Sequence, residues 1–282
     1  MNDVKRVFVS DTMFIGGNSK RFTLIAGPCV IENEDMCFKI ASKVKDICDE
    51  MDIGFIFKAS FDKANRSSID SPRGVGLEEG LNILKRIRSD LNIPVITDVH
   101  ESWQCSLVGN VVDVIQIPAF LCRQTDLLIA AAKTGKVINV KKGQFLAPWE
   151  MNNVIKKIEE AGNDKILVCE RGSSFGYNNL VVDMTGLITM RKLGYPVVFD
   201  ATHSVQKPGG KGLTSDGKRE FVPILMRAAL AVGVDAIFAE VHPDPENALS
   251  DGPNQIHLDD LKKILLEAVK VDDVIKRLVN EG

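Results

Sequence analysis

The most constraining feature of the sequence is a repeated alternation of short apolar runs with helical stretches. Eight apolar runs of strand length lie at 22–26, 53–57, 94–97, 114–117, 137–140, 166–169, 196–199 and 236–239. Helical periodicity follows each of them, at 34–51, 77–91, from about 102, and at 125–133, 148–162, 181–193, 220–232 and 258–278. Such alternation predicts a parallel sheet covered by helices. Eight units in 282 residues fit a closed (β/α)8 barrel, a TIM barrel, better than an open doubly wound sheet.

The first residues follow a different pattern. Apolar and polar residues alternate over 4–15 and stop at Gly16-Gly-Asn-Ser19, which predicts a β-hairpin. Because no linker or change of composition interrupts the chain, we expect a single domain over 1–282, in which residues 1–21 form a hairpin that caps one end of the barrel. No Gly-x-Gly-x-x-Gly follows the first apolar run, which argues against a dinucleotide site there.

Composition excludes several classes of partner. Lys and Arg number 35 against 38 Asp and Glu, so no basic excess suggests nucleic acid. We find no apolar run long enough to span a bilayer and no signal peptide after Met1. The six cysteines stand singly without a Cys-x-x-Cys pair, as is typical of reduced thiols in a cytoplasmic protein. We therefore expect a cytoplasmic protein that acts on small molecules.

Polar or reactive residues lie at or just after the ends of all eight apolar runs. In a barrel, the carboxyl ends of the strands form the functional face, so these side chains should surround one mouth. They are Cys29, Lys58, Asp98, Gln116, Lys142, Arg171, His203 and Glu240.

One group of these residues is cationic. Lys58, Lys63, Lys142 and Arg171, with Arg66 and Arg123 in loops, suit a ligand that carries several anionic groups, such as phosphate and carboxylate. Lys141 beside Lys142 faces the other way, and periodicity alone does not choose between them; we assign the role to Lys142.

A second group has the chemistry of metal ligands. In a closed barrel the last strand neighbours the first and the seventh, so Cys29, His203 and Glu240 converge, and Asp251 in the following loop reaches the same place. His242 shares a strand face with Glu240 and competes with it for the role. Sulfur and nitrogen donors argue against magnesium and calcium. Iron and zinc fit best, and manganese and cobalt also fit.

Longer blocks of sequence resemble the 3-deoxy-D-manno-octulosonate 8-phosphate synthases. They are Lys58-Ala-Ser-Phe-Asp-Lys-Ala-Asn-Arg-Ser-Ser68, Gln116-Ile-Pro-Ala-Phe-Leu-Cys-Arg-Gln-Thr-Asp126, Asn139-Val-Lys-Lys-Gly-Gln-Phe-Leu-Ala-Pro148, Glu170-Arg-Gly-Ser-Ser-Phe-Gly-Tyr-Asn-Asn-Leu180 and Asp200-Ala-Thr-His-Ser-Val-Gln206. The blocks run across nearly the whole chain. The resemblance implies condensation of phosphoenolpyruvate with D-arabinose 5-phosphate, for the inner core of bacterial lipopolysaccharide.

The resemblance also implies roles for single residues. Phosphoenolpyruvate would be held by a set that includes the backbone of Ala119: Lys58, Lys63, Gln116, Ala119, Lys142, Gln144 and Arg171. Arabinose 5-phosphate would be held by Asn65, Arg66 and Ser67, with Arg123 reaching its phosphate from a neighbouring subunit of a homotetramer. Cysteine at position 29, where a metal-independent branch has asparagine, resembles the metal-dependent branch.

The catalytic residues expected from this chemistry are Lys58, Asp98, Lys142 and His203. Asp98 and His203 are both candidates for moving protons, and the sequence does not separate them. Three other interpretations stay open: the same chemistry on erythrose 4-phosphate, giving the seven-carbon product; a class I aldolase with a Schiff-base lysine; and a binding barrel without catalysis.

Overall fold

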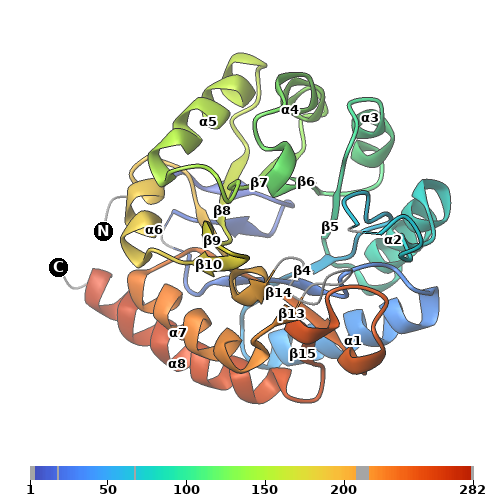
Figure 1. Ribbon diagram of the computed structural model, residues 1–282. Helices are drawn as coiled ribbons and strands as arrows, with labels where there is room; N and C mark the ends of the chain where they lie inside the picture. Colours follow the sequence, from blue (N-terminus) through green and yellow to red (C-terminus); the bar gives the residue numbers. More distant parts are fainter. Residues whose placement is uncertain (1–3, 18, 67, 208–215, 281–282) are drawn as a thin grey trace.

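The computed structural model describes residues 4–17, 19–66, 68–207 and 216–280. Eight parallel strands form a closed barrel (Figure 1), because the seventh strand pairs with the eighth and the eighth with the first. In chain order the barrel strands are β3 (Thr23–Gly27), β4 (Gly54–Lys58), β5 (Val95–Asp98), β6 (Val114–Ile117), β7 (Val137–Lys141), β8 (Ile166–Glu170), β11 (Val197–Asp200) and β14 (Ala236–His242). This confirms the predicted barrel.

Helices surround the barrel and bury one face each against it. The α-helices are α1 (Glu34–Glu50), α2 (Leu77–Leu91), α3 (Gln104–Gly109), α4 (Thr125–Ala132), α5 (Met151–Glu160), α6 (Met184–Arg191), α7 (Val222–Val232) and α8 (Leu261–Asn280). In α1, for example, Cys37, Ile40, Ala41 and Val44 recur at helical spacing and are all buried. The core between strands and helices therefore follows from the periodicity in the sequence.

The N-terminal hairpin closes one end of the barrel. Its strands β1 (Val7–Phe8) and β2 (Phe14–Ile15) pair antiparallel. Val7, Val9 and Ile15 pack with the barrel's interior layer, which includes Val114 and Val137, the first residues of β6 and β7. The hairpin also bonds to the chain just before β11, where Lys5 N donates to Gly194 O at 3.0 Å. The predicted hairpin is confirmed, and it leaves the carboxyl ends of the strands free for a site.

Two parts of the fold differ from the sequence predictions. A second hairpin, β9 (Ser173–Gly176) with β10 (Asn179–Val181), follows β8, so the helix expected from position 181 begins only at Met184. Tyr177 and Asn178 both adopt left-handed backbone conformations, which makes the turn. The Asp183 carboxylate then caps α6 by accepting from Thr185 N.

The last barrel strand is longer than predicted. β14 continues to His242 because Val241 and His242 pair with the short strand β15 (Ile256–His257). Between these strands lie two short 3-10 helices, η5 (Pro245–Asn247) and η6 (Gly252–Asn254). Four other 3-10 turns, η1 (Ala119–Leu121), η2 (Pro148–Glu150), η3 (His203–Val205) and η4 (Arg219–Phe221), and the small strands β12 (Gln206–Lys207) and β13 (Asp216–Gly217) complete the described elements.

Among the described helices, we find none with the length and apolar character that crossing a bilayer requires. All six cysteines are buried as free thiols.

Candidate active site at the carboxyl end of the barrel

A cavity of about 990 Å³ opens at the carboxyl ends of the barrel strands. Most of the residues predicted from strand ends and adjoining loops line it: Lys58, Lys63, Asn65, Arg66, Asp98, Gln116, Ala119, Gln144, Arg171, His203, Glu240 and Asp251. Cys29 is buried and contacts Asp251, a lining residue. The predicted functional face is therefore a real concavity with convergent charged groups.

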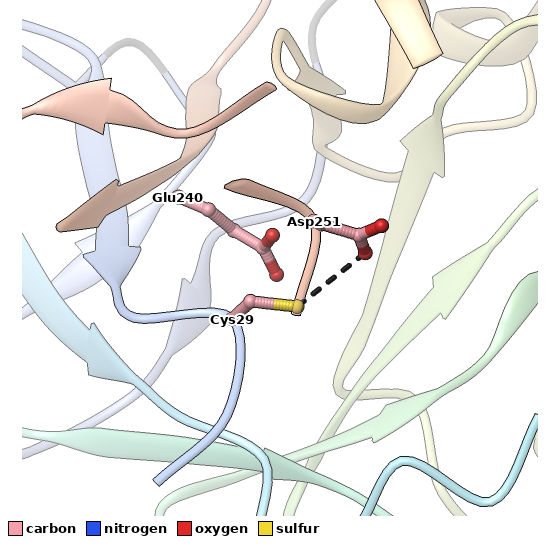
Figure 2. Close-up of side chains that lie close together, drawn as sticks. All are labelled: Cys29, Glu240 and Asp251. Carbon is pink, nitrogen blue, oxygen red and sulfur yellow. Dashed lines mark hydrogen bonds between the residues drawn. The ribbon is translucent and has the colours of Figure 1, made fainter. Parts of the chain in front are cut away.

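Cys29, Glu240 and Asp251 form a cluster on one wall of the cavity. Their ligand atoms lie within 4.8 Å of one another, and the Cys29 Sγ–Asp251 Oδ2 distance is 3.4 Å. Figure 2 shows the three side chains pointing toward a common centre. One oxygen of Glu240, Oε2, is buried without a hydrogen-bond partner in the described structure. A thiol and two carboxylates that converge with an unsatisfied oxygen are a fitting donor set for a transition-metal cation.

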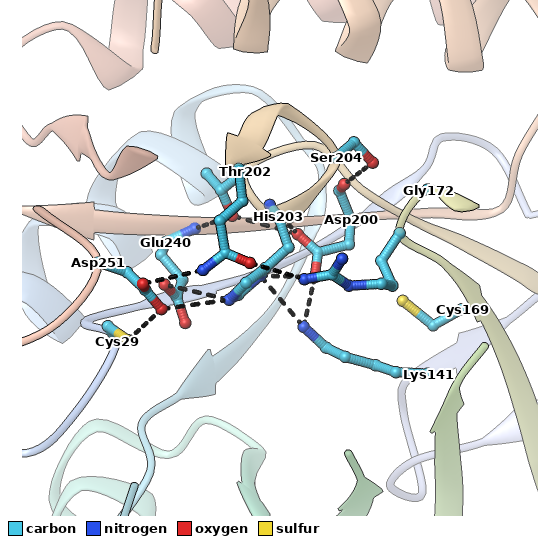
Figure 3. Close-up of polar contacts among 12 residues, drawn as sticks. Cys29, Lys141, Cys169, Gly172, Asp200, Thr202, His203, Ser204, Glu240 and Asp251 are labelled. Atoms are coloured by element: carbon cyan, nitrogen blue, oxygen red, sulfur yellow. Dashed lines mark hydrogen bonds and ion pairs between the residues drawn. The ribbon is translucent and has the colours of Figure 1, made fainter. Parts of the chain in front are cut away.

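His203 lies beside this cluster, in η3 after the neighbouring strand β11. Its Nε2 lies 3.7 Å from Glu240 Oε2 and 3.8 Å from Asp251 Oδ2. Its Nδ1 lies 2.7 Å from Asp200 Oδ2, and Asp200 also accepts from the backbone N of His203. When the imidazole is neutral, a carboxylate that accepts a hydrogen bond from Nδ1–H leaves the lone pair on Nε2, which is the arrangement found around metal-ligating histidines. Figure 3 shows this chain of contacts from Lys141 through Asp200 and His203 toward Glu240 and Asp251.

The charges in this wall control one another's protonation. Burial raises the pKa of the Cys29 thiol, and Glu240 beside it raises it further. Burial also opposes ionisation of Glu240, but Lys58 and His203 outweigh it and lower the pKa of the carboxyl. Burial would lower the pKa of His203, yet Asp200 raises it above its ordinary value. The thiol and the imidazole thus both hold their protons more tightly than usual, and a nearby cation would favour the loss of these protons.

Backbone geometry brings these ligands together. A Cβ on Gly27 would lie 1.9 Å from Lys58 O, so only glycine lets the chain before Cys29 approach β4 this closely. A Cβ on Gly252 would lie 2.2 Å from Pro245 O, so glycine is also required where η6 packs on η5. Asp251 itself has a left-handed backbone, with φ of 50°, a conformation that Asp tolerates better than most residues.

Lys58 connects the cluster to the cationic wall. It ends β4 and is buried, and its Nζ donates to Cys29 O at 2.9 Å and to Glu240 Oε1 at 2.6 Å. Lys63 Nζ lies 3.9 Å from the same Glu240 oxygen. Burial would lower the pKa of Lys63, but Cys29, Glu240 and Asp98 hold it well above its ordinary value. Lys63 therefore remains charged next to the cluster.

The lysine that faces the cavity from β7 is Lys141, which corrects the placement expected for Lys142. Lys141 ends β7, lines the cavity, and contacts Asp200 Oδ2 and, at 3.3 Å, His203 Nδ1. The Lys142 amine instead turns to the outer layer, where it donates to Leu146 O and Ser173 Oγ and lies 3.6 Å from Glu170. The strand's alternation puts consecutive lysines on opposite faces, and the inner face belongs to the first.

Unsatisfied polar atoms mark where an anion could bind. Arg171 is buried; its NH2 donates to Gln206 Oε1 at 2.9 Å, whereas its NH1 has no hydrogen-bond partner in the described structure. Burial lowers the pKa of the Arg171 guanidinium relative to its ordinary value, yet an arginine stays charged. Gln144 Oε1 is also buried without a partner among the described residues; as an acceptor, it suits a hydroxyl group or water and not an anion. Buried polar atoms without a partner in a cavity are available to bind a ligand or water.

Asp98 belongs to a hydrogen-bonded layer across three strands. It accepts from Ser60 Oγ at 2.7 Å and from Gln116 Nε2 at 2.5 Å, while Gln116 Oε1 accepts from Asn139 Nδ2 at 2.9 Å. Burial opposes ionisation of Asp98, but Lys58 and Lys63 outweigh it and lower its pKa. The network fixes the Gln116 amide with its nitrogen toward Asp98.

The loop after β4 reaches the rim of the cavity. Arg66 donates to Pro72 O at 2.9 Å and to Ser250 Oγ at 2.7 Å, beside Asp251, and Asn65 is exposed at the same rim. Ser67, also predicted here, lies outside the described residues.

Two further predicted residues lie away from the cavity of their own chain. The Arg123 side chain is exposed and is not among the cavity's lining residues. His242, the competitor of Glu240, faces Glu32, whose Oε1 lies 3.2 Å from its Nε2. Glu240, and not His242, therefore belongs to the cluster with Cys29 and Asp251.

Comparison with known proteins agrees with this geometry. The model of the DAHP synthetase I family matches residues 6–277, nearly the whole chain. The chain belongs to this family. Within it, a protein of Fusobacterium nucleatum named 2-dehydro-3-deoxyphosphooctonate aldolase is 61% identical over 276 residues, covering 98% of this chain and 99% of the relative.

Other relatives carry the same name. The protein of Cyanothece sp. strain PCC 7425 is 63% identical over 255 residues, covering 90% of this chain and 93% of its own. That of Agrobacterium fabrum is 56% identical over 259 residues, covering 92% of each chain. The family resemblance found in the sequence is thus confirmed at the level of the named relatives.

Sequence reasoning missed two positioning residues in this member of the DAHP synthetase I family. Asp200 orients His203, and the signal was present as a carboxylate three positions before the histidine at a strand end. Gln255 is buried and joins the segments that carry Cys29 and Asp251: its Oε1 accepts from Cys29 N at 3.2 Å and its Nε2 donates to Ser250 O at 2.8 Å. Because both partners are backbone groups, no spacing in the sequence indicates them.

Proposed function

We propose that this chain condenses phosphoenolpyruvate with D-arabinose 5-phosphate and water to give 3-deoxy-D-manno-octulosonate 8-phosphate and phosphate. The observation that carries the proposal is the identity of 61% over nearly the full length with a relative named 2-dehydro-3-deoxyphosphooctonate aldolase. The cavity agrees with it, because buried cations and unsatisfied donors suit a substrate that carries both phosphate and carboxylate.

Phosphoenolpyruvate would bind against the wall made by β4 to β8. Arg171 offers a free N–H group, Lys141 and Lys63 offer charge, and the backbone of Ala119 lines the same cavity. Asn65 and Arg66 at the rim would hold the sugar phosphate. The aldehyde carbon would then lie between the enol carbon of phosphoenolpyruvate and the cluster of Cys29, Glu240 and Asp251.

The reaction makes one bond between the substrates and breaks one carbon–oxygen bond. The third carbon of phosphoenolpyruvate attacks the aldehyde carbon, and the aldehyde oxygen takes a proton. Water then adds to the second carbon, and the bond from that carbon to the phosphate oxygen breaks, releasing phosphate. Lys58 and Lys63 lie where they can stabilise developing negative charge. Asp98 and His203 both remain candidates for moving the protons.

A divalent transition metal held by Cys29, His203, Glu240 and Asp251 is part of the proposal. Charge balance supports it. Four cations in the buried layer face four carboxylates: Lys58, Lys63, Lys141 and Arg171 against Asp98, Asp200, Glu240 and Asp251. With His203 neutral, as a metal ligand must be, these side chains leave no surplus positive charge for a polyanionic substrate. A bound divalent ion would supply Lewis acidity at the aldehyde or the water. Iron and zinc suit the donors best, and manganese and cobalt also fit.

The metal proposal has a direct test at Cys29. Cys29→Asn should lower bound metal, measured by elemental analysis after gel filtration, on the order of 100-fold in affinity. Some metal-independent activity is expected to survive, as in the asparagine-containing branch. Metal content equal to that of the unsubstituted protein would contradict the ligand assignment.

We also propose a homotetramer. Exposed aromatic side chains follow three adjacent strands, β6, β7 and β8: Phe120, Phe145, Trp149, Phe175 and Tyr177. Large apolar patches of this kind suit an interface with another subunit. The exposed Arg123 lies just after η1 in the same region, where it could enter a neighbouring cavity. Light scattering of Phe175→Ser beside the unsubstituted protein tests this: a tetramer should weaken, and a monomer in both would contradict the proposal.

A cytoplasmic location is proposed because all six cysteines are free thiols, as in reducing compartments.

The experiment that tests the reaction measures phosphate release from phosphoenolpyruvate with two aldoses. Arabinose 5-phosphate should support turnover, and erythrose 4-phosphate should support little. Release with erythrose 4-phosphate alone would replace this proposal with the seven-carbon synthase. Binding of phosphoenolpyruvate without release in either case would indicate a binding barrel.

A further inference from the structure

The segment that carries Asp251 is held by contacts outside the barrel sheet. Two of the proposed metal ligands lie on or close to barrel strands: Glu240 is within β14, and His203 comes three residues after β11. Asp251 comes nine residues after the end of β14, after η5, and has a left-handed backbone. Its place in the cluster therefore depends on whatever fixes residues 243–250.

Glu32 contacts both ends of this segment. Its Oε1 accepts from Leu249 N at 2.9 Å and lies 3.2 Å from His242 Nε2, the last residue of β14. Glu32 is itself only three residues after Cys29, and its side chain is 16% exposed. One carboxylate thus links the Cys29 segment with the beginning and the end of the loop that leads to Asp251.

The tautomer of His242 follows from the hydrogen bond at its other ring nitrogen, Nδ1. His242 Nδ1 accepts from Asp244 N at 3.0 Å. In a neutral imidazole the proton must then be on Nε2, the atom that faces Glu32. His242 Nε2 has no hydrogen-bond partner among the described residues, so its approach to Glu32 is a close polar contact and not a hydrogen bond. The hydrogen bond from Leu249 N is therefore the contact that fixes the Glu32 carboxylate, with His242 beside it.

We propose that Glu32 is a positioning residue for the metal centre, acting through Leu249 and His242 to hold Asp251 beside Cys29. The proposal rests on the metal centre proposed above. Glu32 touches neither the substrates nor the cation. Its loss should let the 243–250 segment shift and separate Asp251 from Cys29, while His203 and Glu240 stay on their barrel elements. Metal affinity should fall, and binding of phosphoenolpyruvate to the opposite wall should not.

The test compares three variants in cobalt titrations of chelator-treated protein. Cobalt bound to a thiolate has a charge-transfer absorption, so the Cys29 ligand is observed directly, and competition with a chelator gives the dissociation constant. Glu32→Ala should weaken cobalt binding about 10- to 100-fold. Glu32→Gln keeps an acceptor for Leu249 N but loses the charge that faces His242, and should be weakened less, about threefold to tenfold.

Glu34→Ala is the matched control. Glu34 is two residues further along the same segment and forms an exposed ion pair with Arg86. Its loss should leave the cobalt dissociation constant within twofold of that of the unsubstituted protein. Calorimetric binding of phosphoenolpyruvate to the metal-free proteins should give the same constant for all variants.

An unchanged cobalt constant in Glu32→Ala overturns the role of Glu32 and leaves the metal centre intact. If Glu32→Ala does not fold, Glu32→Gln decides: an unchanged constant there overturns the proposal. Failure of the unsubstituted protein to bind cobalt overturns the metal centre and the role of Glu32 with it. Equal loss of cobalt binding in Glu34→Ala also overturns the proposal, because it would show a general effect of the segment.

Discussion

Carboxylates are buried at both ends of the barrel, but their partners differ. At the amino end, Asp113 accepts from Val95 N, Asp235 from Val197 N, and Asp272 from Phe22 N, each at or next to the first residue of a strand. At the carboxyl end, Glu240 and Asp251 face a thiol, an imidazole and lysines.

The difference shows what a buried charge does at each end. Carboxylates at the amino end take the backbone N–H groups that the barrel would otherwise leave unpaired, which is a structural task. Those at the carboxyl end converge on one another, which costs stability unless a cation or substrate joins them. We therefore expect substitutions at the amino end to change unfolding free energy, and substitutions at the carboxyl end to change binding and turnover.

The largest effect should come from the amino end. Arg191→Met leaves Asp235 without its guanidinium partner, whose NH1 lies 2.5 Å from the carboxylate. Breaking a buried pair in this way should lower the free energy of unfolding by about 3–5 kcal/mol, measured by urea denaturation. The Michaelis constants of the folded variant should be unchanged. A raised Michaelis constant without loss of stability would break the distinction between the two ends.

The two adjacent lysines at the end of β7 test the same distinction, between stability and substrate binding, at neighbouring positions. Lys141→Ala should lower kcat/KM for phosphoenolpyruvate on the order of 100-fold, since Lys141 faces the cavity. Lys142→Ala should instead lower stability by about 2 kcal/mol, because it leaves Glu170 and Leu146 O without their buried amine. Steady-state kinetics and denaturation of both variants check this. The reverse pattern would restore Lys142 to the site.

A smaller effect is expected at the rim. Arg66→Ala should raise the Michaelis constant for arabinose 5-phosphate about tenfold and that for phosphoenolpyruvate much less. Arg66 also contacts Ser250 beside Asp251, so Ser250→Ala is the control for an indirect effect through the loop that carries Asp251. Equal changes in both Michaelis constants would mean that the loop after β4 does not select the sugar.

The smallest effect concerns Asp272 at the amino end. Burial raises the pKa of Asp272 to about 6, so the folded protein binds this proton more tightly than the unfolded chain. Stability from this group is present at low pH and is lost as pH rises from about 4 through 6. Asp272→Asn keeps an acceptor for Phe22 N and should gain about 1 kcal/mol at pH 8 but little at pH 4. Thermal unfolding at both pH values checks this; a loss at pH 8 would contradict it.

Most of the fold and one half of the site could be predicted from the sequence. Strand alternation fixed the barrel, and β14 beside β3 and β11 explains why Cys29, His203 and Glu240 meet. The choice of Lys142 over Lys141 was wrong, because it depends on where β7 ends, within one residue. The roles of Gln255 and Glu32 depend on backbone partners more than 200 positions away, which no local pattern reveals.

The central claim is that the carboxyl end works as a metal-assisted condensation site. The most direct measurement is phosphate release from phosphoenolpyruvate and arabinose 5-phosphate by chelator-treated protein, before and after addition of one equivalent of zinc or ferrous iron. We predict that release falls on the order of 100-fold without metal and returns with it. Full activity in protein shown by elemental analysis to be metal-free would contradict the account.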